Sequence, residues 1–264
     1  MTRKNNNCFV IAIIISYLGL NYLPVFGWWI SMIGTFFIIF FGRKAWSKNY
    51  LQRLGIPQST LQYFISIVLL IVFLLVTFSL IMTIIYERNY GFEIANNYKI
   101  VHIFFYTLNE EIVLGALLLF SLSNKYDKIN PIFISIIVAF VFAIMHYIFY
   151  RWVFQGEARG ILSYFTITTL FVIGVLRNNL ILIAGHIGYS WAIHYSWMLI
   201  MFGCSIYLKE NNILLTETER FNVFIGNRTT FIFALVIAAL TSVWIIFDKD
   251  KISRANVTVI KRRV

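Results

Sequence analysis

Two adjacent carboxylic acids, Glu110 and Glu111, lie inside an apolar stretch of the chain, and two of the next three apolar stretches contain the histidines His146 and His186. A charged side chain at the centre of a bilayer costs roughly 2.5–3.5 kcal/mol, so such residues are functional candidates by default. Glutamate and histidine in a dry cavity can activate water as a general base or bind a metal ion. These residues therefore predict a polar site inside a membrane-spanning bundle.

The composition predicts a polytopic membrane protein. Of the 264 residues, 60% are hydrophobic and 12% are charged, and the mean hydropathy is +0.79. Soluble domains contain roughly 45–50% apolar and about 25% charged residues. We expect one all-α integral membrane domain over residues 1–264. The net charge of +11 does not indicate nucleic-acid binding, because the basic residues cluster between apolar stretches and at both ends, as orientation signals do.

A helix needs about 20 apolar residues to cross the hydrocarbon, and the sequence predicts about eight such helices. Basic residues dominate loops 42–60 and 123–130 and the C-terminal tail, whereas 207–228 balances them with glutamates. Because cytoplasmic loops are enriched in Lys and Arg, we expect a multi-pass cell-membrane protein with both termini in the cytoplasm. Arg177 is assigned to the turn after the sixth helix. The expected spans are 8–23, 25–41, 61–85, 100–122, 131–150, 161–176, 180–206 and 229–247.

Each candidate also has a structural interpretation. Consecutive helix positions differ by about 100°, so one glutamate of the pair can face a cavity while the other faces a neighbouring helix. The alternative is a pair of hydrogen-bonded structural acids. His146 alone is typical of an aromatic helix end at the membrane interface. His186 shares a helix face with Ser190, whereas His194 is rotated by about 80° from His186 and is interpreted as structural.

Three short motifs between about residues 100 and 200 resemble those of the CPBP family, also called the CAAX-protease and bacteriocin-processing or Abi family. The first family motif is a Glu-Glu pair followed by three residues and an arginine, and Glu110-Glu111 matches the pair. The second is Phe-x-x-x-His, matched by Phe142 and His146. The third is His-x-x-x-Asn or a variant, preceded by a helix with a characteristic glycine. His186 and Gly174 match this third motif in order and spacing.

The resemblance implies an eight-helix intramembrane endopeptidase with residues 100–200 as its catalytic core. In the family, the first glutamate and first histidine activate water, which implies these roles for Glu110 and His146. The second histidine and the asparagine stabilise the oxyanion, which implies that role for His186 and Ser190. Glu111 is then an auxiliary acid or a structural partner. We expect no cofactor.

Zinc is the alternative to a mechanism without a cofactor. Glu110, His146 and His186 also match the three protein ligands of a catalytic zinc site. These residues lack the compact His-Glu-x-x-His spacing of helical zinc sites. The depths of the histidines also differ. Counted from the cytoplasmic ends of their segments, His146 and His186 are more than about 10 Å apart in depth at 1.5 Å per residue.

Two positions depart from the family motifs. Gly115 stands in place of the arginine, which leaves Glu111 without its presumed partner, and Ser190 stands in place of the asparagine. Loss of one oxyanion donor typically costs about a hundredfold in rate. We expect a working endopeptidase that cleaves a peptide or a membrane-associated protein in bacteriocin immunity or peptide maturation. The richness in Ile, Asn, Lys and Phe favours a bacterial source.

Two other classes of function fit the same residues. The departures at Gly115 and Ser190 favour a non-catalytic membrane scaffold or immunity protein on the same fold. A small transporter is the third alternative, because intramembrane glutamate and histidine can form a proton relay. The chain shows no pair of broken helices of the kind that transporters contain. The endopeptidase is therefore the preferred hypothesis.

Overall fold

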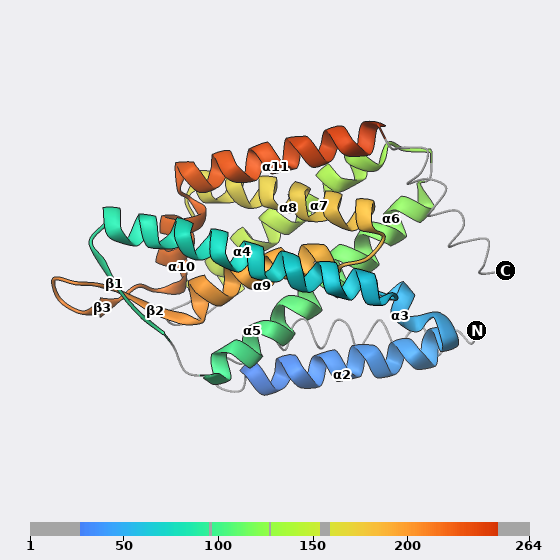
Figure 1. Ribbon diagram of the computed structural model, residues 1–264, viewed down its shortest axis with the longest axis horizontal. Coiled ribbons are helices and arrows are strands. Elements are labelled where there is room, and N and C mark those ends of the chain that lie inside the picture. Colours follow the sequence, from blue (N-terminus) through green and yellow to red (C-terminus); the bar gives the residue numbers. More distant parts are fainter. Residues whose placement is uncertain (1–26, 95–96, 127, 154–158, 248–264) are drawn as a thin grey trace.

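The computed structural model describes residues 27–94, 97–126, 128–153 and 159–247, and the predicted span 8–23 lies outside them. The described chain is mostly helical, as expected, with one small antiparallel sheet that the sequence analysis did not predict (Figure 1). The elements are α2 Gly27–Trp46, η1 Ser47–Asn49, α3 Tyr50–Arg53, α4 Thr60–Glu87, β1 Tyr90–Ile94, α5 Asn97–Glu110, η2 Glu111–Leu118, α6 Leu119–Lys125, α7 Pro131–Ile148, η3 Phe149–Val153, α8 Tyr164–Ala184, α9 Gly188–Phe202, β2 Cys204–Leu208, β3 Ile213–Leu214, α10 Glu217–Arg220, η5 Phe221–Ile225 and α11 Arg228–Phe247.

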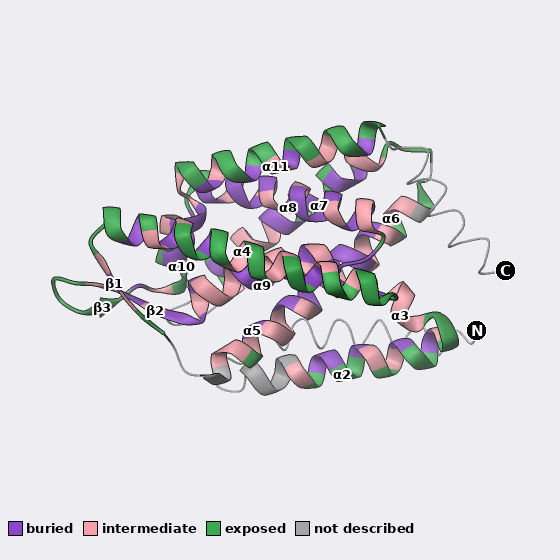
Figure 2. Ribbon diagram, in the orientation of Figure 1, coloured by how far each residue is buried: buried purple, intermediate pink, exposed green. Residues whose placement is uncertain are grey.

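The long helices form a bundle along the longest axis of the molecule (Figure 1). Helix α7 packs on α8, α11 on α8, α4 on α9, and α2 on α5. Figure 2 shows α8 and α9 mostly buried or partly buried, whereas α4 and α11 have exposed outer faces. Those faces are apolar, and Leu75 and Leu240, for example, are about two-thirds exposed. A continuous apolar exterior with all helical backbone groups paired internally is what a lipid environment requires.

Five of the described helical segments are long and apolar enough to cross a membrane. They support a membrane protein, but they do not support the predicted count of eight spans. The division of the sixth and seventh spans at 176–180 is wrong, because α8 continues to Ala184 and α9 has only 15 residues. The five segments are Thr60–Glu87, Lys99–Ser123, Pro131–Val153, Tyr164–Ala184 and Arg228–Phe247.

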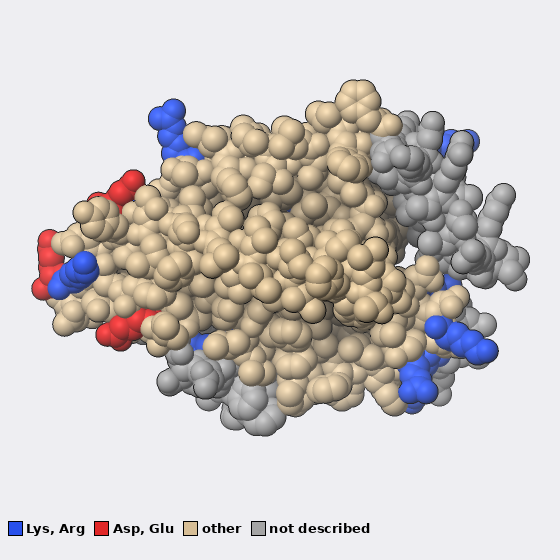
Figure 3. All heavy atoms as spheres, in the orientation of Figure 1, with Lys and Arg blue, Asp and Glu red and all other residues tan. Residues whose placement is uncertain are grey.

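The connections gather at the two ends of the bundle. Loop 42–60, the α6–α7 connection and the turn after α8 lie at one end, and the sheet and α10 lie at the other (Figure 1). Figure 3 shows acidic side chains at the sheet end and none exposed along the apolar middle of this face. The basic loops 42–60 and 123–130 thus lie at one end of the bundle, and the charge-balanced segment 207–228 lies at the other. The assignment of the basic end to the cytoplasm stays a prediction.

Helix α8 contacts α7, α9 and α11, and its buried residue Asn179 is hydrogen-bonded to two of these neighbours. The Asn179 amide donates to Ser242 Oγ at 2.8 Å and accepts from Ser135 Oγ at 2.8 Å. A Cβ on Gly174 would lie 3.0 Å from Ala139, so glycine permits the close approach of α7 and α8. The helix ends at Gly185, which has a φ of 72° in the left-handed region that favours glycine.

Candidate active site at the junction of α5, α8 and α9

The two adjacent glutamates face different surroundings. Glu110 is the last residue of α5, and Glu111 is the first residue of η2, a π-helical stretch of a kind that often occurs at functional sites. Glu110 lines a cavity at the middle of the bundle, whereas Glu111 is fully buried and is held by residues of α8 and α9. The pair thus adopts the arrangement that helix geometry allows, with one carboxylate toward a cavity and the other toward neighbouring helices.

Glu111 is anchored from two helices. The Ser190 hydroxyl donates to Glu111 Oε2 at 2.7 Å, and His194 Nδ1 lies 3.0 Å from Oε1. Because an ionised carboxylate only accepts hydrogen bonds, His194 Nδ1–H is the donor. Arg177 Nε lies 3.7 Å from the same Oε1 atom. The expectation that Glu111 lacks a cationic partner is therefore wrong, because the arginine comes from α8.

Position 115 has no room for the arginine of the family motif. A Cβ built on Gly115 would lie 2.7 Å from Ile181 Cδ1 and 3.1 Å from Glu111 Oε2. A real Cβ does not approach another carbon so closely. Ile181 of α8 thus occupies the space beside Gly115, and Arg177, one turn earlier on the same helix, supplies the positive charge.

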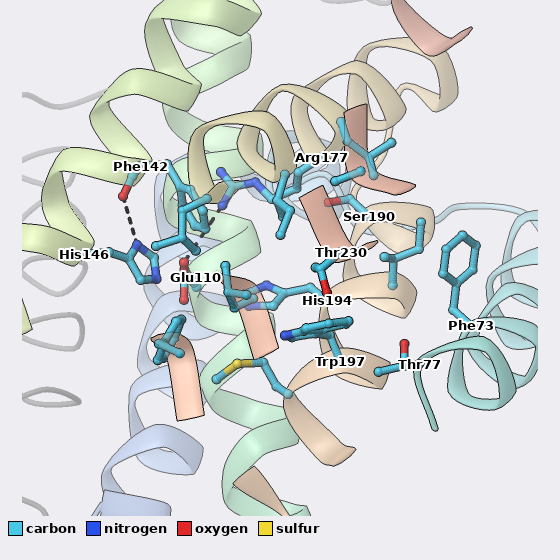
Figure 4. A pocket seen from close by; sticks show the side chains of 18 of the residues that line it. Phe73, Thr77, Glu110, Phe142, His146, Arg177, Ser190, His194, Trp197 and Thr230 are labelled. Atoms are coloured by element: carbon cyan, nitrogen blue, oxygen red, sulfur yellow. Dashed lines mark hydrogen bonds and ion pairs between the residues drawn. The ribbon is translucent and has the colours of Figure 1, made fainter. Parts of the chain in front are cut away.

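Glu110 is buried beside a positive charge and faces a histidine. Its side chain is 3% exposed, and Arg177 Nη1 lies 3.9 Å from Oε1. That oxygen has no hydrogen-bond partner among the residues that the structure describes. Figure 4 shows the Glu110 carboxylate turned toward His146. A buried carboxylate oxygen in this state can accept a proton from a water molecule or from a ligand.

The ring of His146 is fixed by its own helix. His146 Nδ1 lies 2.9 Å from the Phe142 carbonyl oxygen. A carbonyl only accepts hydrogen bonds, so Nδ1 carries the hydrogen, and the neutral ring presents Nε2 as an acceptor. Figure 4 shows this second nitrogen on the side of Glu110. The tautomer is therefore the one in which His146 can orient or deprotonate a water molecule beside Glu110.

Phe142 connects the histidine to the arginine. Its ring centroid lies 4.4 Å from that of His146, and Arg177 Cζ lies 4.6 Å from the same ring centroid. The contact with Arg177 is a cation–π interaction, which stabilises a buried guanidinium. The Phe-x-x-x-His pattern of α7 therefore positions two members of the site rather than one.

His186 does not join the cavity. It lies in the turn between α8 and α9, where its Nδ1 accepts a hydrogen bond of 3.0 Å from the Gly188 N–H. Its ring packs against Tyr189 with centroids 4.6 Å apart. Because α8 reaches Ala184, this turn lies at the end of the bundle, which accounts for the predicted difference in depth. The predicted convergence of Glu110, His146 and His186 is therefore wrong for His186.

Ser190 lines the cavity, but its hydroxyl hydrogen is committed to Glu111. Two further residues of the site, Arg177 and His194, were not predicted from the sequence. His194 lies one turn after Ser190 on α9, so the two share a face toward Glu111. The four-residue spacing of Ser190 and His194 is the signal in the sequence that places both on one helix face, whereas His194 is rotated away from His186.

The cavity has a volume of about 120 Å³, which is room for several water molecules. Most of its lining is apolar and comes from α4, α7, α8, α9 and α11, and its charged or ring-nitrogen groups lie near Glu110. Within the described ranges no group of three or more His, Cys, Asp or Glu residues is arranged to hold a metal ion. The alternative zinc set of Glu110, His146 and His186 is not assembled.

Comparison with known proteins identifies no relative. No protein-family model, no curated protein and no solved structure matches this chain. The resemblance to the CPBP family therefore rests on its three short motifs, and membership of that family stays a prediction.

Proposed function

We propose that the protein is an intramembrane endopeptidase of the CPBP type, acting on a peptide or a membrane-associated protein segment in a bacterial cell membrane. One observation carries the proposal. Glu110 is a buried carboxylate with an oxygen that lacks a hydrogen-bond partner in the described chain, and it lies beside His146 on the wall of a cavity with room for water. Bacteriocin immunity and peptide maturation are the biological roles that the family resemblance implies.

The chemistry is the addition of water to a peptide bond. Glu110 takes a proton from a water molecule that His146 Nε2 orients, and the water oxygen bonds to the carbonyl carbon. The electron pair of the carbonyl double bond moves to its oxygen. When the tetrahedral intermediate collapses, the carbon–nitrogen bond breaks, and the proton held by Glu110 passes to the departing nitrogen. No other co-reactant is needed.

The anchored second glutamate supports this role by fixing the first. Glu111 joins η2 to α9 through Ser190 and His194, so the neighbouring Glu110 is held at one position on the cavity wall. Pre-organisation of this kind matters because a displacement of about 1 Å can cost roughly a hundredfold in rate. Glu111 is in this proposal a structural partner and not a proton carrier.

The scaffold alternative loses part of its support. It depended on the absence of an arginine at Gly115, and Arg177 supplies that charge from α8. A proton relay through Glu110 and His146 fits a transporter as well, but the acidic and imidazole side chains Glu110, His146 and His194 line a single cavity. The endopeptidase therefore explains more of the described site than either alternative.

The direct test is a comparison of membrane proteomes from cells that carry the wild-type protein, Glu110→Gln or Glu93→Gln. Glu93 is exposed in β1, outside the residues that line the cavity, so Glu93→Gln is the matched control. The proposal expects an uncleaved protein to accumulate, and its internal cleavage product to disappear, only in Glu110→Gln. Equal proteomes at equal protein abundance in the membrane would reject the endopeptidase and favour the scaffold.

A further inference from the structure

Two buried hydrogen-bond donors line the cavity without an acceptor. None of the three guanidinium nitrogens of Arg177 makes a hydrogen bond within the described residues, and neither does the indole Nε1 of Trp197. The side chain of Arg177 is 4% exposed, and its nitrogens lie 3.7 and 3.9 Å from the two carboxylates. A buried donor without an acceptor is destabilising, because it has lost its hydrogen bonds to water without replacement. An acceptor oxygen that enters the cavity can satisfy both groups.

The donors predicted from the sequence are committed elsewhere. The Ser190 hydroxyl and His194 Nδ1–H both bind Glu111. His186 lies outside the cavity, and His146 Nδ1–H binds the Phe142 carbonyl. The family resemblance implied that Ser190 and His186 donate hydrogen bonds to the oxyanion. In this structure neither residue has a free donor in the cavity.

Arg177 and Trp197 are placed to fill that role. Figure 4 shows the Arg177 guanidinium and the indole nitrogen of Trp197 on the side of the cavity where Glu110 and His146 lie. They come from α8 and α9, two helices whose positions are fixed by buried polar contacts. Donors already aimed at the point where negative charge develops give the largest electrostatic contribution to catalysis.

We infer that Arg177, assisted by Trp197, binds the carbonyl oxygen of the scissile peptide bond and stabilises the oxyanion formed when water adds to it. This inference rests on the proposed endopeptidase function. The substrate class is a peptide segment that presents a backbone carbonyl to Arg177, with its apolar side chains against the walls of the cavity. The guanidinium is suited to this role because it keeps its charge and offers several donors in one plane.

The test measures binding rather than turnover. The probe is a phosphinic pseudopeptide with apolar side chains, in which a tetrahedral phosphinate replaces one peptide group, and the reference ligand is the plain peptide of the same side chains. Both are titrated against full-length protein labelled with ¹⁵N-tryptophan in lipid nanodiscs. The Trp197 resonance is assigned from Trp197→Phe, and Trp191, whose Nε1 donates to Thr107 Oγ1 at 3.1 Å, is the internal control.

The wild-type protein should bind the phosphinate more tightly than the plain peptide and shift the Trp197 indole resonance but not that of Trp191. Arg177→Met should lose the preference for the phosphinate by about 10- to 100-fold, as expected for one charge-assisted hydrogen bond. Trp197→Phe should lose less. Equal affinities for the two ligands in the wild type, or an unchanged preference in Arg177→Met, would overturn the inference.

A second variant keeps the test valid if Arg177→Met does not fold, because that change leaves two buried carboxylates without their cation. Glu111→Gln/Arg177→Met removes one charge of each sign, and Arg177→Lys keeps the charge but loses the planar fork. The outcome is separable from that of the proposed function. If Arg177→Met loses the preference for the phosphinate but the wild-type protein cleaves no substrate, the binding site is kept and the endopeptidase function is rejected. If cleavage depends on Glu110 but Arg177→Met keeps the preference, the endopeptidase function is kept and the role of Arg177 is rejected.

Discussion

The Nε atom of Arg177, on α8, lies 3.7 Å from Oε1 of Glu111, on η2, and so provides the positive charge that the family motif places four residues after the glutamate pair. The same guanidinium also approaches Glu110. Removal of one partner from a buried ion pair typically costs about 3–5 kcal/mol, because the other charge remains buried. The two carboxylates and the arginine are therefore best regarded as one unit.

The space beside Gly115 gives a prediction about packing. Gly115→Ala should destabilise the protein by about 1–3 kcal/mol, because its Cβ would collide with Ile181 Cδ1 at 2.7 Å. Ile181→Val removes that Cδ1 atom, so the same glycine substitution should cost less in the Ile181→Val background. Thermal unfolding of the four proteins in detergent measures the coupling. Additive effects would contradict the described contact.

The hydroxyl of Ser190 gives a prediction about the anchoring of Glu111. Ser190→Ala should cost about 1.5–3 kcal/mol, the usual contribution of a hydrogen bond to a charged group, and should reduce cleavage. Ser196→Ala, on the same helix, is the matched control because Ser196 donates to backbone carbonyls. It should cost about 1 kcal/mol or less. If both variants behave alike in unfolding and cleavage assays, Ser190 has only a packing role.

His186 gives a prediction about pH. Burial lowers the pKa of this imidazole, which lies in the turn outside α8 and α9, from 6.5 to about 4. The unfolded chain therefore binds a proton below about pH 6.5, while the folded protein binds it only near pH 4. The stabilisation from the neutral ring is therefore fully present above about pH 6.5 and is lost as the pH falls to about 4.

His186→Asn tests this dependence, because the Asn oxygen can accept the Gly188 N–H hydrogen bond but does not titrate. The unfolding temperature of the wild type should fall more steeply than that of the variant between pH 6.5 and 4. Parallel curves would contradict the assignment. Because His186 lies outside the cavity, the variant should also keep cleavage activity at neutral pH.

The two ends of the bundle give a prediction about orientation. Reporter fusions at Lys48 and Tyr126 should indicate the cytoplasm, because these residues lie in connections rich in Lys and Arg. A fusion at Asn212, in the turn between β2 and β3, should indicate the outside. If all three reporters give the opposite result, the orientation is reversed while the fold is unaffected.

The sequence predicted those parts of the fold that depend on local pattern. The predicted spans beginning at residues 61 and 131 agree with the starts of α4 and α7, which the structure shows to be capped by Ser59 with Gln62 and by Asn130 followed by Pro131. Helical geometry also allowed Glu110 and Glu111 to face different surroundings, as they do in the structure. The small sheet could not be predicted, because β1 pairs with β2 across more than a hundred residues and β3 is only two residues long.

Arg177 was missed for a physical reason. Arginine near the end of an apolar stretch is usually interfacial, and only the contacts with Glu110, Glu111 and Phe142 show that this one is buried. The absence of Pro or Gly between Arg177 and Gly185 was the available signal that the helix continues. Long-range ion pairs of this kind require the packing of α8 against η2 and α7, which the sequence pattern does not define.

The most direct test of the account is cleavage by purified protein in lipid vesicles, with a membrane segment found in the proteome comparison as substrate. Wild-type protein and Glu93→Gln should cleave it in the presence of a chelator, and Glu110→Gln should show a loss of at least about a hundredfold, because it keeps the shape of the side chain but removes the base. Cleavage by Glu110→Gln at the wild-type rate would show that Glu110 does not activate water.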